Sequence, residues 1–300
     1  MSRVNPSEGE VKIEIPNEIR DLIVVASVSG GKDSTALLLA LREAEVPFRA
    51  VFADTGWEAK ETYEHLDTLR RLICPIDVVK PKRDMVESIR HRAGFPARMQ
   101  RWCTRELKLD PLRKYHDKIA AGGVETVSAM GVRAEESEAR SKMPIWADDD
   151  EWGGYVWRPL LNWSIDDVIA IHHRHGIPIH PLYLAGFERV GCWPCIFERK
   201  EAIRLLAERD PARIEQIAML EQEATEERAR RNEIEPGRYA HSIATFFQTR
   251  DRANAGAMPI HDIVTWAKTE RGGKQLPLLQ PIPQGGCMRW GMCESPNLKE

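Results

Sequence analysis

The chain has 300 residues, of which 42% are hydrophobic and 30% are charged, and its formal net charge is −3. The apolar fraction supports a well-packed hydrophobic core, and the length allows two domains or one domain with an appendage. The net charge gives no sign of an overall basic surface for binding nucleic acid. The opening residues MSRVNPSEGE lack the apolar run of a signal peptide and no segment approaches a membrane span, so we expect a cytoplasmic protein without a membrane partner.

Apolar strands alternate with amphipathic helices through the first half of the chain. We expect strands at 22–27, 48–53, 76–79 and 126–130, and helices at 34–44, 58–73, 84–91 and 107–121. The alternation predicts an α/β fold, a Rossmann-like parallel sheet with helices on both faces. A further strand is expected near residues 11–15, within a short N-terminal extension (1–20).

The second half predicts a smaller, mostly helical C-terminal appendage. A short strand (157–163) precedes a helix over 164–175, which Ser164 caps. Residues 200–232 are charge-rich and helical with one break at Asp210-Pro211, and another helix covers 261–270. We divide the chain into the extension, an α/β domain (21–200) and a helical region with a cysteine-containing tail (201–300).

A glycine-rich turn follows the first strand and opens the first helix. Its residues are Ser29, Gly30, Gly31, Lys32, Asp33 and Ser34. Backbone N–H groups and the positive end of a helix favour an anion at such a turn, and glycines allow close approach of a ligand. The spacing fits neither the Walker A loop nor the G-x-G-x-x-G fingerprint. The alternative is an ordinary strand-to-helix turn, and we favour phosphate binding.

The turn resembles the PP-loop, SGGxDS, of ATP pyrophosphatases, which split ATP between the α and β phosphates. Other segments are similar to those of phosphoadenosine-phosphosulfate (PAPS) reductases, in the same order over about residues 22–200: VFADTGWEAKETYEHL, RWCTRELKLDPL, GVRAEESEARSKMP and RPLLNWSIDDVIAIHHRHGIPIHPLYLAGFERVGCWPC. The chain is therefore identified as a member of this adenine nucleotide alpha hydrolase-like superfamily.

The resemblance implies roles for individual residues. Lys32 and the loop amides would hold the ATP phosphates, and Asp33 would reach Mg²⁺. Gly131, Arg133 and Arg140 would line the phosphate or sulfate site, the arginines alternatively forming a surface salt-bridge cluster. Implied catalytic residues are Lys32, Asp33, Arg133 and Arg140, and implied nucleotide-binding residues also include Ser29, Gly30, Gly31, Ser34, Asp54, Thr55 and Gly131.

Two further sets of residues leave alternatives open. Asp54 either contacts metal or adenosine or merely caps the following helix. His172, His173 and His175 lie on or at the end of one helix, and that pattern is more typical of a packed or solvated face than of general bases. His180, in the HPLY loop, is the histidine we expect nearer the site.

The full SGGKDS form is typical of superfamily members that use ATP, and the chain most resembles the DndC and SspD proteins of DNA phosphorothioation. This resemblance implies an ATP pyrophosphatase that adenylates a DNA phosphate or tRNA base for sulfur insertion, with a cysteine desulfurase as donor. The alternatives are a PAPS or adenylylsulfate (APS) reductase and a non-catalytic nucleotide and redox sensor. The basic segment 80–113 is either a local nucleic-acid face or a solvated surface. A homo-oligomer or a partner subunit remains open.

Six cysteines in such a chain argue against a disulfide framework. APS reductases bind a 4Fe–4S cluster through a turn like Cys192-Trp193-Pro194-Cys195 and an upstream Cys-Cys pair, of which only Cys103 is kept here. The resemblance implies a 4Fe–4S cluster, which takes four ligands, and the chain offers five candidates for them: Cys103, Cys192, Cys195, Cys287 and Cys293. Zinc and inert thiols are the alternatives. Cys293 is alternatively a tail nucleophile, and Cys74 is expected to be a buried thiol.

Overall fold

The computed structural model describes residues 12–149, 154–239, 241, 243–247 and 257–269. The chain divides into two compact units, each assembled from separate segments. The first comprises Met1–Phe52, Glu64–Val79 and Leu112–His180, and the second comprises Ala53–Tyr63, Lys80–Pro111 and Pro181–Glu300. None of the helices in the described ranges is long and apolar enough to cross a membrane. The three-part division at residues 20 and 200 stays a prediction.

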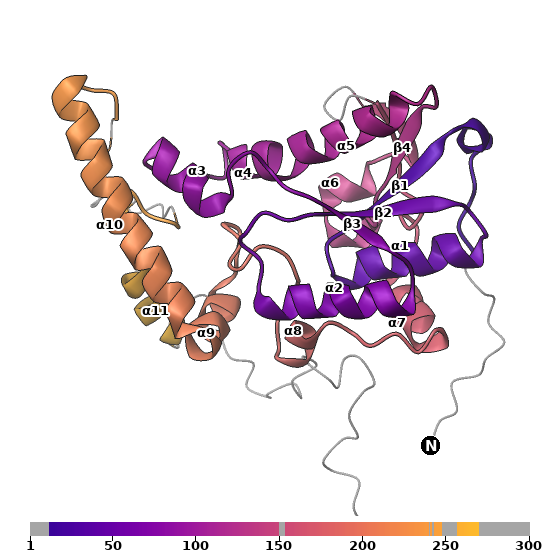
Figure 1. Cartoon of the computed structure of the whole chain (residues 1–300). Helices are drawn as coiled ribbons and strands as arrows, with labels where there is room; N and C mark the ends of the chain where they lie inside the picture. The colour runs from indigo at the N-terminus through magenta and orange to yellow at the C-terminus, as the bar shows by residue number, and fades with distance from the viewer. Residues whose placement is uncertain (1–11, 150–153, 240, 242, 248–256, 270–300) are drawn as a thin grey trace, which may run out of the picture. The chain divides into compact units, whose positions relative to one another are not determined.

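The first unit is built on a six-stranded sheet of order β3-β2-β1-β4-β6-β5 (Figure 1). The strands are β1 (Ile23–Val28), β2 (Phe48–Ala53), β3 (Ile76–Val79), β4 (Thr126–Ala129), β5 (Trp146–Asp149) and β6 (Gly154–Trp157). β1 runs parallel to β2, with Val24 opposite Phe48, and parallel to β4, with Val24 opposite Val127. The apolar side chains of β1 are almost wholly buried, as expected for a central parallel strand.

Helices cover both faces of this sheet, which confirms the predicted α/β class. α1 (Lys32–Glu43) packs beside α7 (Ile165–Arg174) on one face, and α5 (Asp110–Ala120) lies on the other (Figure 1). α2 (Lys60–Leu72) also connects strands of the sheet. Ser164 caps α7 as predicted, since its hydroxyl accepts from Asp167 N in a capping box. Short helical turns complete the unit: η1 (Asn17–Asp21), η3 (Ala134–Glu136) and α6 (Glu138–Ser141).

Two details of the predicted sheet are wrong. Residues 12–15 form no strand, because the polar residues alternating with Ile13 and Ile15 have no neighbouring strand to pair with. The strand expected over 157–163 ends at Trp157, and β6 pairs with an antiparallel edge strand, β5. β5 has the mostly polar sequence WADD, and an edge strand needs no apolar run, so the sequence does not indicate this strand.

The second unit is mostly helical. Its elements are α3 (Met85–Arg92), α4 (Trp102–Thr104), the π-helical turn η2 (Arg105–Leu109), α8 (Pro181–Leu184), α9 (Lys200–Arg209), α10 (Pro211–Ile234) and α11 (Ile260–Lys268). The break predicted at Asp210-Pro211 is real, since Asp210 caps α10 and Pro211 occupies its first turn. Apolar side chains of α3, α9, α10 and α11 form the core of this unit, together with Trp57 and Trp193.

Candidate functional site

The turn between β1 and α1 is closed by its own two serine hydroxyls. Ser29 N donates to Ser34 Oγ (3.1 Å), and Ser34 Oγ donates to the Gly31 carbonyl (2.9 Å). Gly30 has a φ of 76°, a conformation that favours glycine. The turn leads directly into the first residues of the buried helix α1, where the helix dipole favours an anion.

A glycine from the neighbouring strand presses against this turn. Gly131 follows β4, and a Cβ at that position would stand 2.6 Å from the Asp33 carbonyl oxygen and 3.1 Å from Ser34 N. The turn is therefore held against the strand by a contact that only glycine permits. Gly131 was predicted from the family pattern alone, and its packing gives a physical reason for that residue.

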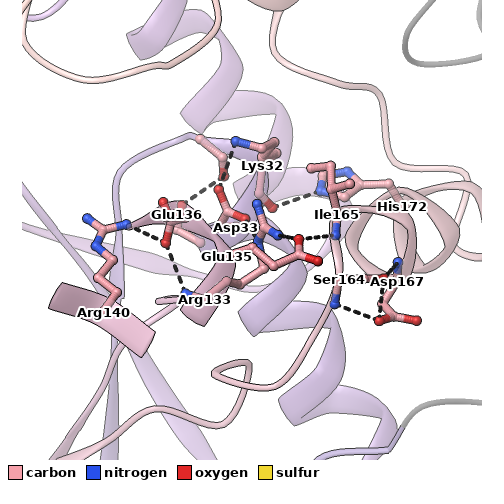
Figure 2. A network of polar contacts seen from close by, with 12 residues as sticks. Lys32, Asp33, Arg133, Glu135, Glu136, Arg140, Ser164, Ile165, Asp167 and His172 are labelled. Carbon is pink, nitrogen blue, oxygen red and sulfur yellow. Dashed lines mark hydrogen bonds and ion pairs between the residues drawn. The ribbon is translucent and has the colours of Figure 1, made fainter. Parts of the chain in front are cut away.

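Asp33 binds two cations, one on each carboxylate oxygen (Figure 2). Arg133 Nε donates to Oδ1 at 2.6 Å, and Lys32 Nζ lies 3.0 Å from Oδ2. The Arg133 side chain is only 5% exposed. Burial disfavours its charge, but the ion pairs, chiefly with Asp33, outweigh burial and raise the pKa of Arg133. Asp33 thus serves here as the counter-ion that fixes the two cationic side chains, and its role as a Mg²⁺ ligand stays a prediction.

Arg133 and Arg140 are joined through a carboxylate network (Figure 2). Arg133 Nη1 donates to Glu135 (2.8 Å), while Arg133 N donates to Glu136 (2.9 Å), which also pairs with Arg140. Glu135 further accepts from Ile165 N at the start of α7 (3.0 Å). Arg133 therefore contacts the turn directly, whereas Arg140 is linked to it through Glu136 and Arg133.

His172, predicted to be only a packed or solvated helix residue, contacts the turn. It is 3% exposed, and its Nε2 lies 2.9 Å from the Lys32 carbonyl oxygen (Figure 2). A carbonyl only accepts, so Nε2 carries the proton, and burial lowers the pKa of the ring. His180 lies instead against His65, with ring centroids 4.9 Å apart. Helical periodicity places a histidine on a packed face but gives no signal of the backbone group it will meet.

The second unit holds the DTGWE segment, organised by a buried carboxylate. Glu58 accepts hydrogen bonds from Thr55 N (3.2 Å), Thr55 Oγ1 (2.7 Å), Trp57 N (3.1 Å) and Tyr63 OH (3.3 Å). Asp54 accepts from Gly56 N (3.0 Å) and Tyr63 OH (2.8 Å). Burial, together with these two carboxylates, raises the pKa of Tyr63. The Thr55 side chain is committed to this local turn, and contacts of Asp54 and Thr55 with a nucleotide stay predictions.

The CWPC turn is bound to the same segment. Trp193 N donates to the Trp57 carbonyl (2.7 Å), and Trp57 Nε1 donates to the Pro194 carbonyl (3.1 Å). The backbones of Cys192 and Glu58 also form an isolated antiparallel β-bridge. These bonds fix the position of the two turn cysteines relative to the DTGWE segment.

Three of the predicted sulfur ligands gather in this unit. Cys103 lies close enough to Cys192 and Cys195 that their charges would raise its pKa, after the larger effect of burial. Burial likewise raises the pKa of Cys192, while the ammonium of Lys108, within hydrogen-bonding reach of its sulfur, opposes that rise. Lys108 has no place in the predicted site, although it stands in the same RWCTRELKLD segment as Cys103.

The grouping of these three thiols does not by itself test the prediction that the protein binds a metal. Across the described ranges, no three or more His, Cys, Asp or Glu side chains are arranged to hold a metal ion. The chemistry of the donors, three thiols, nevertheless fits a thiolate-bound iron–sulfur cluster or zinc. The other two candidates, Cys287 and Cys293, lie outside the described residues. Burial raises the pKa of Cys74, as expected for a packed thiol.

Comparison with known proteins agrees with the motifs. The phosphoadenosine phosphosulfate reductase domain model matches residues 23–198. An uncharacterised 37.8 kDa protein of Escherichia phage 186 is 32% identical over 320 residues, covering 86% of this chain and 91% of that protein. The adenosine 5′-phosphosulfate reductase of Allochromatium vinosum is 30% identical over 200 residues, covering 63% and 75% of the two chains.

A solved structure, the phosphate complex of PAPS reductase from Candida auris, is 18% identical with a TM-score of 0.48, covering 59% of this chain and 84% of that chain. Because the domain model spans more than half of the sequence, the chain belongs to the phosphoadenosine phosphosulfate reductase domain family.

Proposed function

We propose that this chain is an ATP pyrophosphatase that adenylates an oxygen of a nucleic acid, a DNA phosphate or a tRNA base, for replacement by sulfur. The proposal takes its acceptor from the resemblance to DndC and SspD proteins. The observation that carries it is the complete SGGKDS turn, which packs against Gly131 and in which Asp33 pairs with both Lys32 and Arg133.

The arrangement suits a triphosphate better than a smaller anion. Lys32 and Arg133 are both fixed by Asp33, so a phosphate chain entering the turn meets two oriented cations and a helix N-terminus. Oriented charges of this kind stabilise the extra negative charge that develops on the α-phosphate and on the leaving pyrophosphate. His172 holds the Lys32 backbone, so the turn is oriented before the ligand arrives.

The proposed reaction has two displacements. The acceptor oxygen attacks the α-phosphorus, the bond from that phosphorus to the β-bridging oxygen breaks, and pyrophosphate leaves. The terminal sulfur of a persulfide on a donor protein, for which a cysteine desulfurase is the natural class, then attacks the adenylated carbon or phosphorus and AMP leaves. A second thiol cleaves the disulfide so formed, which leaves the sulfur on the acceptor and joins the two protein thiols in a disulfide. Neither displacement changes an oxidation state at the acceptor.

The thiol cluster is proposed as the sulfur-handling part of the protein. Cys103, Cys192 and Cys195, with Cys287 or Cys293, would hold an iron–sulfur cluster, and the chemistry that such a cluster supplies when bound is ligation of sulfur by iron. Lys108 contributes a positive charge beside Cys192, which favours the thiolate form needed for ligation.

A reductase of PAPS or APS is the second candidate. It is favoured by the similarity to the Allochromatium vinosum reductase, which extends over 200 residues. The two functions differ in the bond that is broken, since a sulfonucleotide reductase leaves AMP or its 3′-phosphate without releasing pyrophosphate.

The test is product analysis with labelled ATP and Mg²⁺ under anaerobic conditions, with DNA or tRNA as acceptor and a cysteine desulfurase with cysteine as sulfur donor. AMP with pyrophosphate supports the proposal, and ADP with phosphate overturns it. K32M should lower kcat/KM by about 10²–10³ because it removes an oriented cation at the phosphates. K142M is the matched control, because Lys142 is 72% exposed and pairs with Glu138 in a surface ion pair. Equal activity of both variants would contradict the assigned role of Lys32.

A further inference from the structure

A sharp exposed turn in the second unit carries two arginines. Ala97 and Gln100 exchange backbone hydrogen bonds (3.2 and 3.0 Å), which places Arg98 and Met99 at the tip. Arg98 and Arg101 are exposed, and Met99 is 94% exposed. Met99 is thus an apolar side chain displayed almost fully beside two guanidiniums.

Both guanidiniums lie over one aromatic ring. The Arg98 and Arg101 guanidinium carbons stand 5.6 and 5.3 Å from the centre of the half-buried Phe197 ring. Such cation–π contacts hold the planar heads in fixed orientation without neutralising them. Phe197 follows Cys195 by two residues and Arg101 precedes Cys103 by two, so the arginines stand beside the thiol cluster.

The local charge is strongly positive. Residues 88–105 contain five arginines and no Asp or Glu. Arg90 is paired with Glu223, and Arg92 is paired with Glu106. Within the described part of the chain, no carboxylate pairs with Arg98, Arg101 or Arg105. The last two are one helical turn apart, since Arg105 N bonds to the Arg101 carbonyl, and so they face the same side.

We propose that this arginine surface, formed by Arg98, Met99, Arg101, Arg105 and Phe197, binds a single-stranded nucleic acid and presents it beside the cysteines. Uncompensated guanidiniums in a row fit successive phosphates of a polynucleotide, and their planes, held by Phe197, together with the exposed Met99 suit the stacking of unpaired bases. The inference deepens the proposed function and rests on it for the identity of the acceptor. It favours a nucleic-acid face over a solvated surface, the two interpretations that the sequence leaves for the basic segment 80–113.

The experiment is fluorescence anisotropy of the full chain with labelled single-stranded DNA and RNA of about 16 nucleotides, titrated at several salt concentrations. R98Q/R101Q should weaken binding roughly tenfold or more and reduce the slope of log K against log salt by about 1.4, as loss of two phosphate contacts requires. R98K/R101K should keep the salt slope but lose affinity at high salt, because lysine keeps the charge without the stacking plane.

R230Q/R238Q is the matched control, with the same change in charge at two exposed arginines of the same unit that pair with Glu227 and Glu235. Circular dichroism and thermal melting establish that each variant is folded. An equal loss of binding in the control pair, an absence of binding by the wild type, or equally effective displacement by a polyglutamate of the same charge would each overturn the proposal. The titration contains no ATP, so a chain that binds the oligonucleotide but leaves ATP intact would refute the proposed reaction and not this surface.

Discussion

Replacement of Gly131 by alanine tests how the nucleotide turn is held. The new Cβ would stand 2.6 Å from the Asp33 carbonyl oxygen and 2.8 Å from its carbonyl carbon, distances at which one backbone must move. Both partners are main chain, so no flexible side chain absorbs the overlap. We expect G131A to lower the free energy of unfolding by about 2 kcal/mol, as overpacking does, and to weaken ATP binding tenfold or more by displacing the turn.

G154A is the matched control for this substitution. Gly154 lies in the same unit, at the start of β6, and a Cβ there would meet nothing within 4 Å, so we expect a change of less than about 0.5 kcal/mol. Urea unfolding gives the stability, and displacement of a fluorescent ATP analogue gives the affinity. Unchanged stability and unchanged ATP affinity in G131A would refute the account of the turn as a loop clamped by close approach.

Three further predictions concern buried polar groups. D33N leaves the buried guanidinium of Arg133 without its main counter-ion and should cost about 2 kcal/mol in urea unfolding; an unchanged midpoint would show that the pair contributes nothing. Burial lowers the pKa of His65 to about 4 and that of His180 to about 3. As pH falls, these histidines therefore bind protons in the unfolded chain before they do so in the folded chain, which favours unfolding. Between pH 7 and pH 5 each of the two histidines should lower the free energy of unfolding by about 2 kcal/mol. H180Q should remove one such contribution from the pH profile, and an identical profile would contradict its neutral burial. E58Q replaces one acceptor oxygen with a donor facing N–H and O–H groups and should lower Tm by several degrees, with a simultaneous change in tryptophan fluorescence at the DTGWE segment.

The parallel core of the sheet could be predicted because its signal is local. β2 and β3 have the predicted bounds, and Ser164 caps α7 as its sequence indicates, since buried apolar runs and capping residues act within a few positions. The antiparallel strand β5 was missed because its pairing depends on β6 rather than on its own polar residues. The π-helical turn before α5 was missed for a related reason, since no residue type marks it.

The site was predictable as motifs and not as contacts. The family pattern named Arg133 and Gly131, but the ion pair to Asp33 and the close approach to the turn depend on β4 lying next to β1. His172 and Lys108 were missed because their partners, a backbone carbonyl and a thiol, lie far away in the sequence. The grouping of segments 53–63 and 80–111 with the C-terminal half also follows from long-range packing, which periodicity does not report.

The most direct test of the central claim offers ATP, APS and PAPS side by side to the same anaerobic preparation, with Mg²⁺, a single-stranded nucleic-acid acceptor, a cysteine desulfurase with cysteine as sulfur donor, and reduced thioredoxin. The account predicts that ATP disappears with equal amounts of AMP and pyrophosphate while both sulfonucleotides persist. Consumption of APS or PAPS with release of sulfite, and with ATP intact, would contradict it and assign the SGGKDS turn to a ready-made sulfonucleotide.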